Sequence, residues 1–313
     1  MKTAKKGEWF QLIIPKDWNQ FTIDHILREV WHGPKKLIHQ LKMEKLVTVN
    51  GEQINWHKPL NSGDRFELKF FSEEEFGVIP AYFDIDVLYE DDHLLIVNKP
   101  QGMDTHPNEP SQTNTLANAV AFYLQAKGEY RRVLHIHRLD KDTTGAILFA
   151  KHSFIGAILD RMLEERQIKR TYVALVEGHI ARRKATINQP IGKDRHHPTR
   201  RRISQTGQTA ITHYKVLKEY KSKKCTLIQC RLDTGRTHQI RVHLSSIGHP
   251  LLGDVLYGSE ASFPRQALHA IRLAFIHPLT GEKIECFAPF IDEPGIFPSE
   301  AFELINVHKD DTY

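Results

Sequence analysis

The sequence predicts an α+β protein in two parts, a small N-terminal α+β domain over residues 1–75 and a larger domain over residues 84–313. Short strand-like runs broken by Gly and Pro dominate the larger part. They do not alternate regularly with helices, which favours a mixed, mostly antiparallel sheet with flanking helices. The acidic, polar stretch Ser72–Gly77 precedes Pro80 and predicts a linker over residues 76–83. A chain of 313 residues, 40% of them hydrophobic, can build two such cores.

The first domain is expected to contain two helices and a hairpin. Apolar residues recur at spacings of three and four through residues 21–31 and 35–45, which predicts one helix in each range. The second helix would carry a lysine face made of Lys35, Lys36, Lys42 and Lys45. Asn50-Gly51 is a strong signal for a two-residue hairpin turn. The expected strands are residues 9–14, 46–49 and 65–70.

This order of elements resembles the S4-type RNA-binding module. The resemblance is carried by Val47–Gly51 and by the turn Ser62–Asp64, whereas Gly33–Lys36 stands where the module usually has a basic signature. The resemblance implies that the first domain binds RNA. The alternative is an ordinary α+β appendage with a solvated lysine face.

The larger domain is expected to contain two helices among many strands. Apolar stripes at helical spacing run through residues 115–127 and 154–166. A hairpin is expected over residues 87–97, with Glu90–Asp92 as its turn. Further strands are expected at residues 172–176, 211–218, 226–232 and 283–288.

The composition and charge of the chain indicate its cellular compartment and the kind of partner that it binds. The formal net charge of +5 and the pI of about 8.9 favour a polyanionic partner. Apolar runs all fall short of the ~18 residues of a membrane-spanning helix, and no signal-peptide pattern follows Met1. We therefore expect a cytoplasmic protein that does not bind membranes, and we expect a monomer. Three cysteines are expected to be buried free thiols: Cys225, Cys230 and Cys286.

The 19 histidines do not have the spacing of a metal site. Zinc favours histidines four residues apart on a helix, or cysteine partners, and the close pairs His135/His137 and His196/His197 have neither. We therefore expect no metal and no other cofactor. The histidines are assigned to packing and to hydrogen bonds with RNA.

A carboxylate with a basic neighbour lies near the middle of the chain. His137-Arg138-Leu139-Asp140 follows a β-like run, residues 133–136, and precedes a small-residue turn and the apolar run 146–150. The pattern predicts Asp140 at a strand end beside Arg138. Such an arrangement suits a carboxylate kept ionised for nucleophilic or general-base work. The alternative is a structural Arg–Asp pair in a hairpin.

Two later segments carry aromatic and cationic groups. Tyr172 is expected at a strand edge, where its ring could stack on a flat base, although an ordinary core aromatic has the same pattern. A polar helix start follows Gly235 and contains Arg236, His238, Arg241 and His243. Such groups are costly to bury without partners. A carboxylate and a phosphate backbone would supply those partners.

The most basic run of the chain is Arg195–Arg202, which ends in Arg200, Arg201 and Arg202. It lies in a segment bounded by Gly and Pro, ahead of the strand that begins at Ile211. We expect an exposed hairpin whose arginines contact RNA phosphates. The alternative is a solvated loop.

Together these segments resemble the RluA-type pseudouridine synthases over about residues 84–290. The matching residues follow the family's order: Val97–Pro100, Gly102, His106-Pro107, His137–Gly145, Lys169–Gly178, Gly235–Leu244, Gly248–Asp254 and Leu268–Ala270. Thr144 and Ala146 depart mildly from the residues common there. The resemblance implies the fold of that family's catalytic domain and an enzyme that isomerises uridine to pseudouridine in RNA.

The resemblance also implies roles for single residues. Asp140 would be the catalytic aspartate, and Arg241 would ion-pair with it and hold it ionised. Tyr172 would stack on the target base and assist proton removal from C5. Arg138 would contact the RNA backbone beside the flipped nucleotide. The further RNA-binding candidates are Arg236, His238, Arg200, Arg201 and Arg202.

The implied reaction breaks N1–C1′, turns the base and joins C5 to C1′, so it needs no redox step, phosphate transfer or metal. One carboxylate suffices, by attacking C1′ or the ring C6, or by taking a sugar proton to open a glycal path. The target base must also leave the stack, which costs a few kcal/mol.

We favour 23S ribosomal RNA as the substrate, because an S4-like module is commoner among ribosomal enzymes of this type. Transfer RNA is the alternative substrate. A non-catalytic RNA-binding protein is a second alternative, although a pure binder has no use for an anion in a polyanion-binding groove. A third is a base-excising glycosidase in which Asp142 is a second carboxylate beside Asp140.

Overall fold

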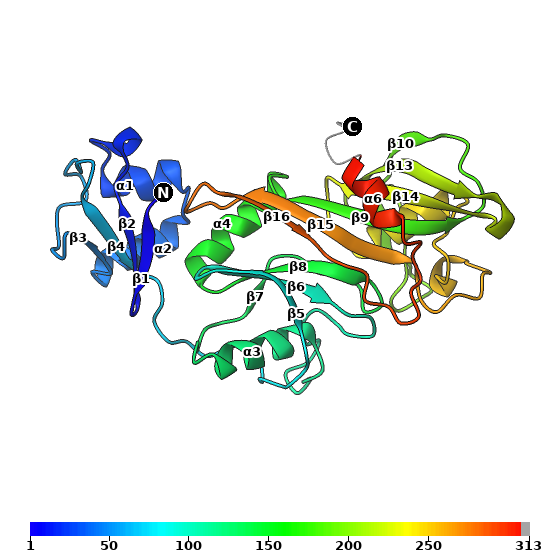
Figure 1. Ribbon diagram of the computed structural model, residues 1–313, viewed down its shortest axis with the longest axis horizontal. Coiled ribbons are helices and arrows are strands. Elements are labelled where there is room, and N and C mark those ends of the chain that lie inside the picture. The colour runs from blue at the N-terminus through cyan, green and yellow to red at the C-terminus, as the bar shows by residue number, and fades with distance from the viewer. Residues whose placement is uncertain (308–313) are drawn as a thin grey trace.

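The structure is a computed structural model that describes residues 1–307. Figure 1 shows an elongated molecule with a small N-terminal module at one end and a long twisted sheet through the remainder. The module has a four-stranded sheet, whereas the larger part has a ten-stranded sheet and a separate two-stranded hairpin. The protein is therefore α+β, as the sequence predicts.

The N-terminal module forms from local signals that the sequence shows clearly. Its elements are β1 (Thr3–Lys6), β2 (Trp9–Ile13), α1 (Ile23–His25), a π-helical turn (Ile26–Val30), α2 (Lys35–Met43), β3 (Val47–Val49) and β4 (Arg65–Lys69), with the strands in the order β1-β2-β4-β3. The Thr22 hydroxyl caps α1 by accepting the His25 N–H at 3.1 Å. Asn50 and Gly51 adopt φ of +55° and +87°, as a two-residue hairpin turn requires.

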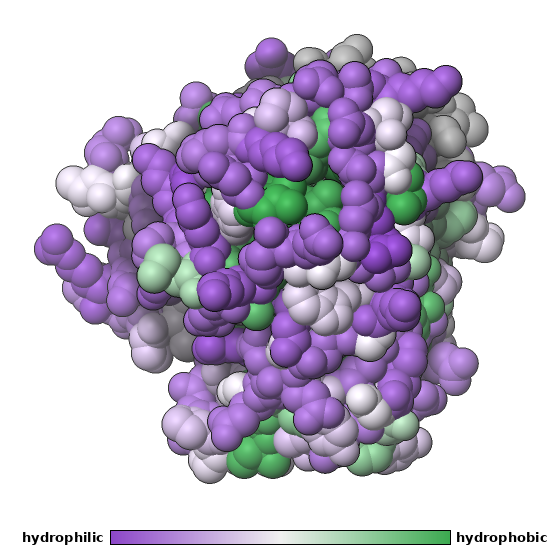
Figure 2. Space-filling view, turned by 90° about the vertical axis from the view of Figure 1, so that its left-hand side faces the viewer, coloured by the Kyte–Doolittle hydropathy of each residue, from purple (hydrophilic) through white to green (hydrophobic). Residues whose placement is uncertain are grey.

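The surface of this module is mostly polar. Hydrophilic side chains cover most of the end of the molecule that it forms (Figure 2). The four lysines of the expected lysine face are exposed, although α2 ends at Met43 and the last of them follows it: Lys35, Lys36, Lys42 and Lys45. After β4 the chain forms neither helix nor strand until Asp86, and Phe76 in this stretch packs into the core of the larger part. The domain boundaries stay a prediction.

The larger part is built on a sheet in the order β10-β13-β14-β9-β15-β8-β6-β5, with β16 beside β15 and β7 beside β8. Among the described strands of this sheet, every pairing is antiparallel except that of β8 with β15. The strands are β5 (Asp86–Glu90), β6 (Leu94–Lys99), β7 (Leu134–His135), β8 (Thr144–Ala150), β9 (Lys169–Glu177), β10 (Lys184–Asn188), β13 (Ile211–Tyr220), β14 (Cys225–Leu232), β15 (Leu268–Ile276) and β16 (Lys283–Phe287). The separate hairpin consists of β11 (Ile191–Lys193) and β12 (Arg201–Ile203). The helices are α3 (Leu116–Ala126), α4 (Ser153–Glu164), α5 (Gln239–Ser246) and α6 (Ala301–Val307).

Helices α3 and α4 cover opposite faces of the sheet where β6 pairs with β8 (Figure 1). Side chains of β6 alternate between these faces, so Ile96 packs in one core with Ile155 of α4 and Val97 packs in another with Val120 of α3. Because both faces are covered, β6 and β8 are buried along their whole length.

The N-terminal module and the larger part share one hydrophobic core. Phe70 stacks on Phe154 of α4 with ring centroids 4.9 Å apart, and Phe10 of β2 meets His93 edge-on at 4.7 Å. Gly33 lies against the Phe154 ring, where an added Cβ would come within 2.7 Å. The two parts are therefore packed together, and the chain between them is only one of their connections.

Asp140 lies in a loop, so the prediction that it sits at a strand end is wrong. β7 already ends at His135, and β8 begins at Thr144. The Thr105 hydroxyl takes the place of a strand partner: it accepts from the Leu139 N–H at 3.1 Å and donates to the Leu139 carbonyl at 3.0 Å. Asp140 follows directly, in the loop between β7 and β8.

The three cysteines are buried free thiols, as expected. Within residues 1–307, no helix has the length and apolar character to cross a membrane.

Candidate active site

Asp140 lies on a wall shared by two hollows in the surface. The larger has a volume of about 590 Å³ and the smaller about 240 Å³. Arg138, His238 and Arg241 line both hollows together with Asp140. The Asp140 side chain is 18% exposed, so its carboxylate can be approached from solvent.

Lys99 anchors the loop that carries Asp140. Its side chain is fully buried, and its ammonium donates to the carbonyls of Pro100 at 2.8 Å, Met103 at 2.6 Å and Lys141 at 2.8 Å. Burial lowers the pKa of Lys99 to about 7. Since Lys141 is the next residue after Asp140, these bonds fix the backbone at the carboxylate.

Arg241, on α5, bridges two carboxylates. Its Nη1 donates to Asp140 Oδ2 at 2.9 Å, while Nε and Nη2 donate to the two oxygens of Asp254 at 2.7 and 2.9 Å. Burial opposes the charge on Arg241, but the hydrogen bonds and charges of Asp254 and Asp140 raise its pKa above the ordinary value. The ion pair that the family resemblance implies is present. Asp254 is a further partner, which the sequence shows only as the end of a turn.

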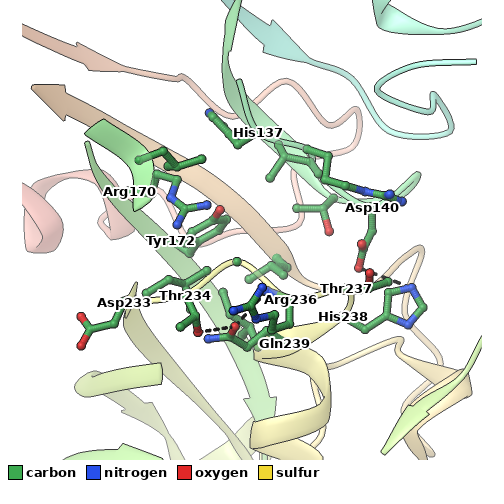
Figure 3. Close-up of a pocket in the computed structure, with 18 of the residues that line it drawn as sticks. His137, Asp140, Arg170, Tyr172, Asp233, Thr234, Arg236, Thr237, His238 and Gln239 are labelled. Carbon is green, nitrogen blue, oxygen red and sulfur yellow. Dashed lines mark hydrogen bonds and ion pairs between the residues drawn. The ribbon is translucent and has the colours of Figure 1, made fainter. Parts of the chain in front are cut away.

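Tyr172 lies inside β9, so the expectation of a strand-edge position is wrong. Pairing with β15, which is distant in sequence, extends β9 back to Lys169, and β14 pairs on its other side. Tyr172 is 4% exposed and lines the larger hollow beside Arg170 (Figure 3). Burial raises the pKa of the phenol, Arg170 opposes this rise and Asp140 adds to it.

Arg170 is a cation of the larger hollow that sequence reasoning missed. Its side chain is 9% exposed, and its Nε has no hydrogen-bond partner among the described residues. Gly235 allows its approach, because a Cβ there would lie 3.0 Å from Arg170 Nη1. Its position two residues before Tyr172 on a strand was the available signal, since such residues point to the same face.

The turn before α5 presents Arg236 and His238 to the larger hollow (Figure 3). The Gln239 side chain holds this turn by accepting from the Arg236 N–H at 3.0 Å. His238 adopts a φ of +58°, and its Nε2 lies 3.9 Å from Asp140 Oδ2. His243 is fully buried and lines neither hollow, so only part of this polar cluster belongs to the site.

The basic run lies on the hairpin β11–β12, as the sequence predicts. Arg200 and Arg202 are exposed, and Arg201 is half-buried. Thr199, in the loop of this hairpin, lines the smaller hollow, so the hairpin borders the site. The exposed Arg138 borders both hollows. Contact between these arginines and RNA stays a prediction.

Comparison with known proteins shows the family. The model of RNA pseudouridylate synthase matches residues 93–246, and that of the RluD ribosomal pseudouridine synthase N-terminal domain matches residues 10–66. The uncharacterized RNA pseudouridine synthase YhcT of Bacillus subtilis is 46% identical over 287 residues, which cover 91% of this chain and 95% of that protein. The chain belongs to the RNA pseudouridine synthase family.

Other proteins that are similar to this chain support the same family assignment. The ribosomal large subunit pseudouridine synthase D of Haemophilus ducreyi is 38% identical, with 85% of this chain and 84% of that protein covered. The solved structure of human RNA pseudouridylate synthase domain containing 1 has the same fold, with a TM-score of 0.56 and 24% identity, and covers 73% of this chain and 96% of its own. The resemblance read from the sequence is confirmed, and the chain is an isomerase that makes pseudouridine in RNA.

Proposed function

We propose that Asp140 is the catalytic carboxylate of this synthase and that Arg241 orients it. The observation that carries the proposal is their 2.9 Å ion pair beside a hollow of about 590 Å³, a usual size for a ligand site. Asp254 binds the rest of the same guanidinium, so the direction of Arg241 is set before the substrate arrives.

The target uracil is expected to turn within the larger hollow while N1–C1′ breaks and C5–C1′ forms. Asp140 would attack C1′ or C6, or take a proton from the sugar, and C5 loses its proton at the end. Tyr172 would supply the surface on which the base stacks. Because burial raises the pKa of its phenol, Tyr172 is protonated at neutral pH, which favours stacking over general-base catalysis.

RNA contacts are assigned to cations around the hollows and on the hairpin. Arg138, Arg236 and His238 would contact the nucleotide and its neighbours, because they line the hollow that Asp140 lines. The hairpin arginines Arg200–Arg202 would contact phosphates further along the strand. Their exposure and their run of like charge support this assignment.

We infer that the substrate is large-subunit (23S) ribosomal RNA. Relatives with 35–38% identity carry the name ribosomal large subunit pseudouridine synthase D, and the N-terminal match is to a ribosomal synthase domain. Transfer RNA is the competing substrate. We also infer a cytoplasmic monomer, because one chain supplies every group of the proposed site and buried free thiols suit a reducing compartment.

The decisive test follows tritium release from RNA labelled at uridine C5. The native protein should release tritium from large-subunit ribosomal RNA and leave the transfer RNA pool unchanged. Asp140→Asn keeps the side-chain shape, and it should slow release on the order of 10³-fold or more, because it removes the reacting charge. Asp160→Asn, an exposed change on α4, is the matched control and should keep the native rate.

Product analysis separates the alternatives. Release from transfer RNA alone would contradict the ribosomal proposal, and free uracil would indicate a glycosidase. An Asp140→Asn protein with the native rate would remove Asp140 from the mechanism.

A further inference from the structure

Tyr257 lies where the basic hairpin meets the active site. It is 5% exposed, and its phenol oxygen accepts the Arg201 N–H at 2.9 Å and lies 2.8 Å from His238 Nδ1. Its ring faces the Arg241 guanidinium, whose Cζ is 5.0 Å from the ring centroid. One buried side chain therefore touches the backbone of the hairpin and two neighbours of Asp140.

We propose that Tyr257 is a positioning residue that couples the docking of RNA on the hairpin β11–β12 to the orientation of Asp140. The proposal rests on the function proposed for Asp140, and it adds a residue that acts through His238 and Arg241. The sequence motifs do not single out this residue.

The contacts of the phenol indicate where its one proton goes. The oxygen accepts from the Arg201 N–H, and we assign its O–H as the donor to His238 Nδ1, the acceptor that lies 2.8 Å away. Burial raises the pKa of Tyr257, so the phenol keeps this proton at neutral pH. His238 is then the tautomer with its proton on Nε2, the nitrogen that lies 3.9 Å from Asp140 Oδ2. The phenol thus makes His238 present an N–H to the carboxylate.

Charged groups on several elements surround His238 and shift the pKa of its imidazole. Burial lowers its pKa, Asp140 and Asp254 raise it, and Arg241 and Arg201 lower it. The balance is a lowered pKa, so the ring is neutral at pH 7. The hydrogen bond from the phenol acts in the same direction, because a protonated imidazole has no lone pair with which to accept it.

The contact between Tyr257 and the Arg201 backbone attaches the hairpin β11–β12 to the rest of the molecule. Its two strands pair with each other and not with the ten-stranded sheet, and an isolated hairpin is marginally stable in water. Ile191 of β11 joins Ala210, Val242 and Tyr257 in a small apolar cluster. Phosphates bound by the hairpin arginines would therefore move a backbone that is tied to the phenol at Arg201. Any such shift changes the positions of His238 and Arg241 relative to Asp140.

Tyr257→Phe tests the proposal, because it removes the oxygen and keeps the ring against Arg241. Single-turnover isomerisation of saturating RNA should slow about tenfold, with RNA affinity changed less than about twofold. His238 should titrate at higher pH once the phenol no longer donates to Nδ1. Since a protonated His238 competes with Arg241 for Asp140, the acid limb of the rate profile should move to higher pH. Tyr220→Phe, which removes a phenol bonded to Glu300 at 2.9 Å, is the matched control.

A double-variant cycle measures the coupling itself. Replacing Arg200, Arg201 and Arg202 by Ala should slow single turnover in the native background and slow it less in the Tyr257→Phe background. A purely structural role for the phenol predicts additive losses. Additive losses or an unshifted pH profile would overturn the proposal.

The native protein offers a test that does not depend on the variant folding. Nitrogen NMR of the His238 ring should show the proton on Nε2 and an acceptor at Nδ1. The opposite tautomer would sink the proposal. A native protein that is inactive on both RNA pools would instead contradict the proposed function, so the two failures are distinct.

Discussion

Arg241 binds two carboxylates, and its contact with Asp254 determines which of its nitrogens reaches Asp140. Its Nε and Nη2 bind Asp254, which is 2% exposed, and only Nη1 reaches Asp140. A bidentate Arg–carboxylate pair has a fixed plane. Asp254 therefore sets the plane of the guanidinium, and Asp140 receives a donor from a fixed direction.

Asp254→Asn should reduce both stability and rate. It leaves the buried Arg241 with one carboxylate in place of two, which we expect to lower the free energy of unfolding by about 3 kcal/mol. The freed guanidinium can tilt away from Asp140, so single-turnover isomerisation should slow by up to about 100-fold. Denaturant unfolding and tritium release measure the two effects. Glu285→Gln neutralises the partner of Arg272 at 2.8 Å, outside both hollows, and should keep the rate.

The elements around the site differ in how many strands pair with them. Strand β9, which carries Tyr172, is paired on both sides within the ten-stranded sheet. The hairpin β11–β12 has no such neighbours, and it carries Arg200 in its loop and Arg201 and Arg202 at the start of β12. This contrast places the proposed stacking surface on a fixed element and the proposed phosphate contacts on one that can adjust to RNA.

Replacing Arg200, Arg201 and Arg202 by Ala should weaken RNA binding most at low salt. Each lost phosphate contact removes about 0.7 to 0.9 from the slope of log K against log salt, so the slope should fall by about 2 to 3. Binding measured at several salt concentrations gives the slope. Lys221→Ala with Lys223→Ala is the control, since these residues lie at the far end of β14, roughly 24 Å along the strand from Leu232 at the hollow. An unchanged slope in the arginine variant would rule out the hairpin as a phosphate contact.

The whole molecule behaves as one packed body because its first core crosses between the two parts. Phe10, Trp31 and Phe70 of the N-terminal module share this core with Phe154 of α4. Arg161 of α4 also donates to the His32 carbonyl at 2.9 Å. The module is thereby held at a set position relative to the hollows, which fixes where RNA bound to it would enter.

Phe154→Ala should separate the module from the larger part. The lost ring leaves a cavity in the shared core and should cost about 4 kcal/mol. We expect the native protein to unfold in one calorimetric transition, and the variant in two, with the module melting first. Leu124→Ala, a buried change in α3 that lies in a different core, should lower the melting temperature and keep one transition. Two transitions in the native protein would contradict the shared-core interpretation.

The expected helices and most of the expected strands are present because local signals specify them. Periodicity of three and four marks α2, α3 and α4, and the positive φ of Asn50 and Gly51 matches their residue types. β1 was not predicted, because Thr3–Lys6 is exposed throughout and has no apolar alternation to reveal a strand. Its hydrogen bonds to β2 make it a strand.

The sequence by itself determined the α+β class, which follows from local periodicity, and the family, which follows from the order of its motifs. The resemblance to that family then implied the pairing of Asp140 with Arg241. Only the tertiary structure decided that Asp140 lies in a loop, that Tyr172 is interior to the sheet, and that Arg170, Asp254 and Tyr257 join the site. Each of these depends on a contact between separate elements, such as Thr105 with Leu139 or β9 with β15. Sheet register and core packing set such contacts, and the local pattern of residues does not encode them.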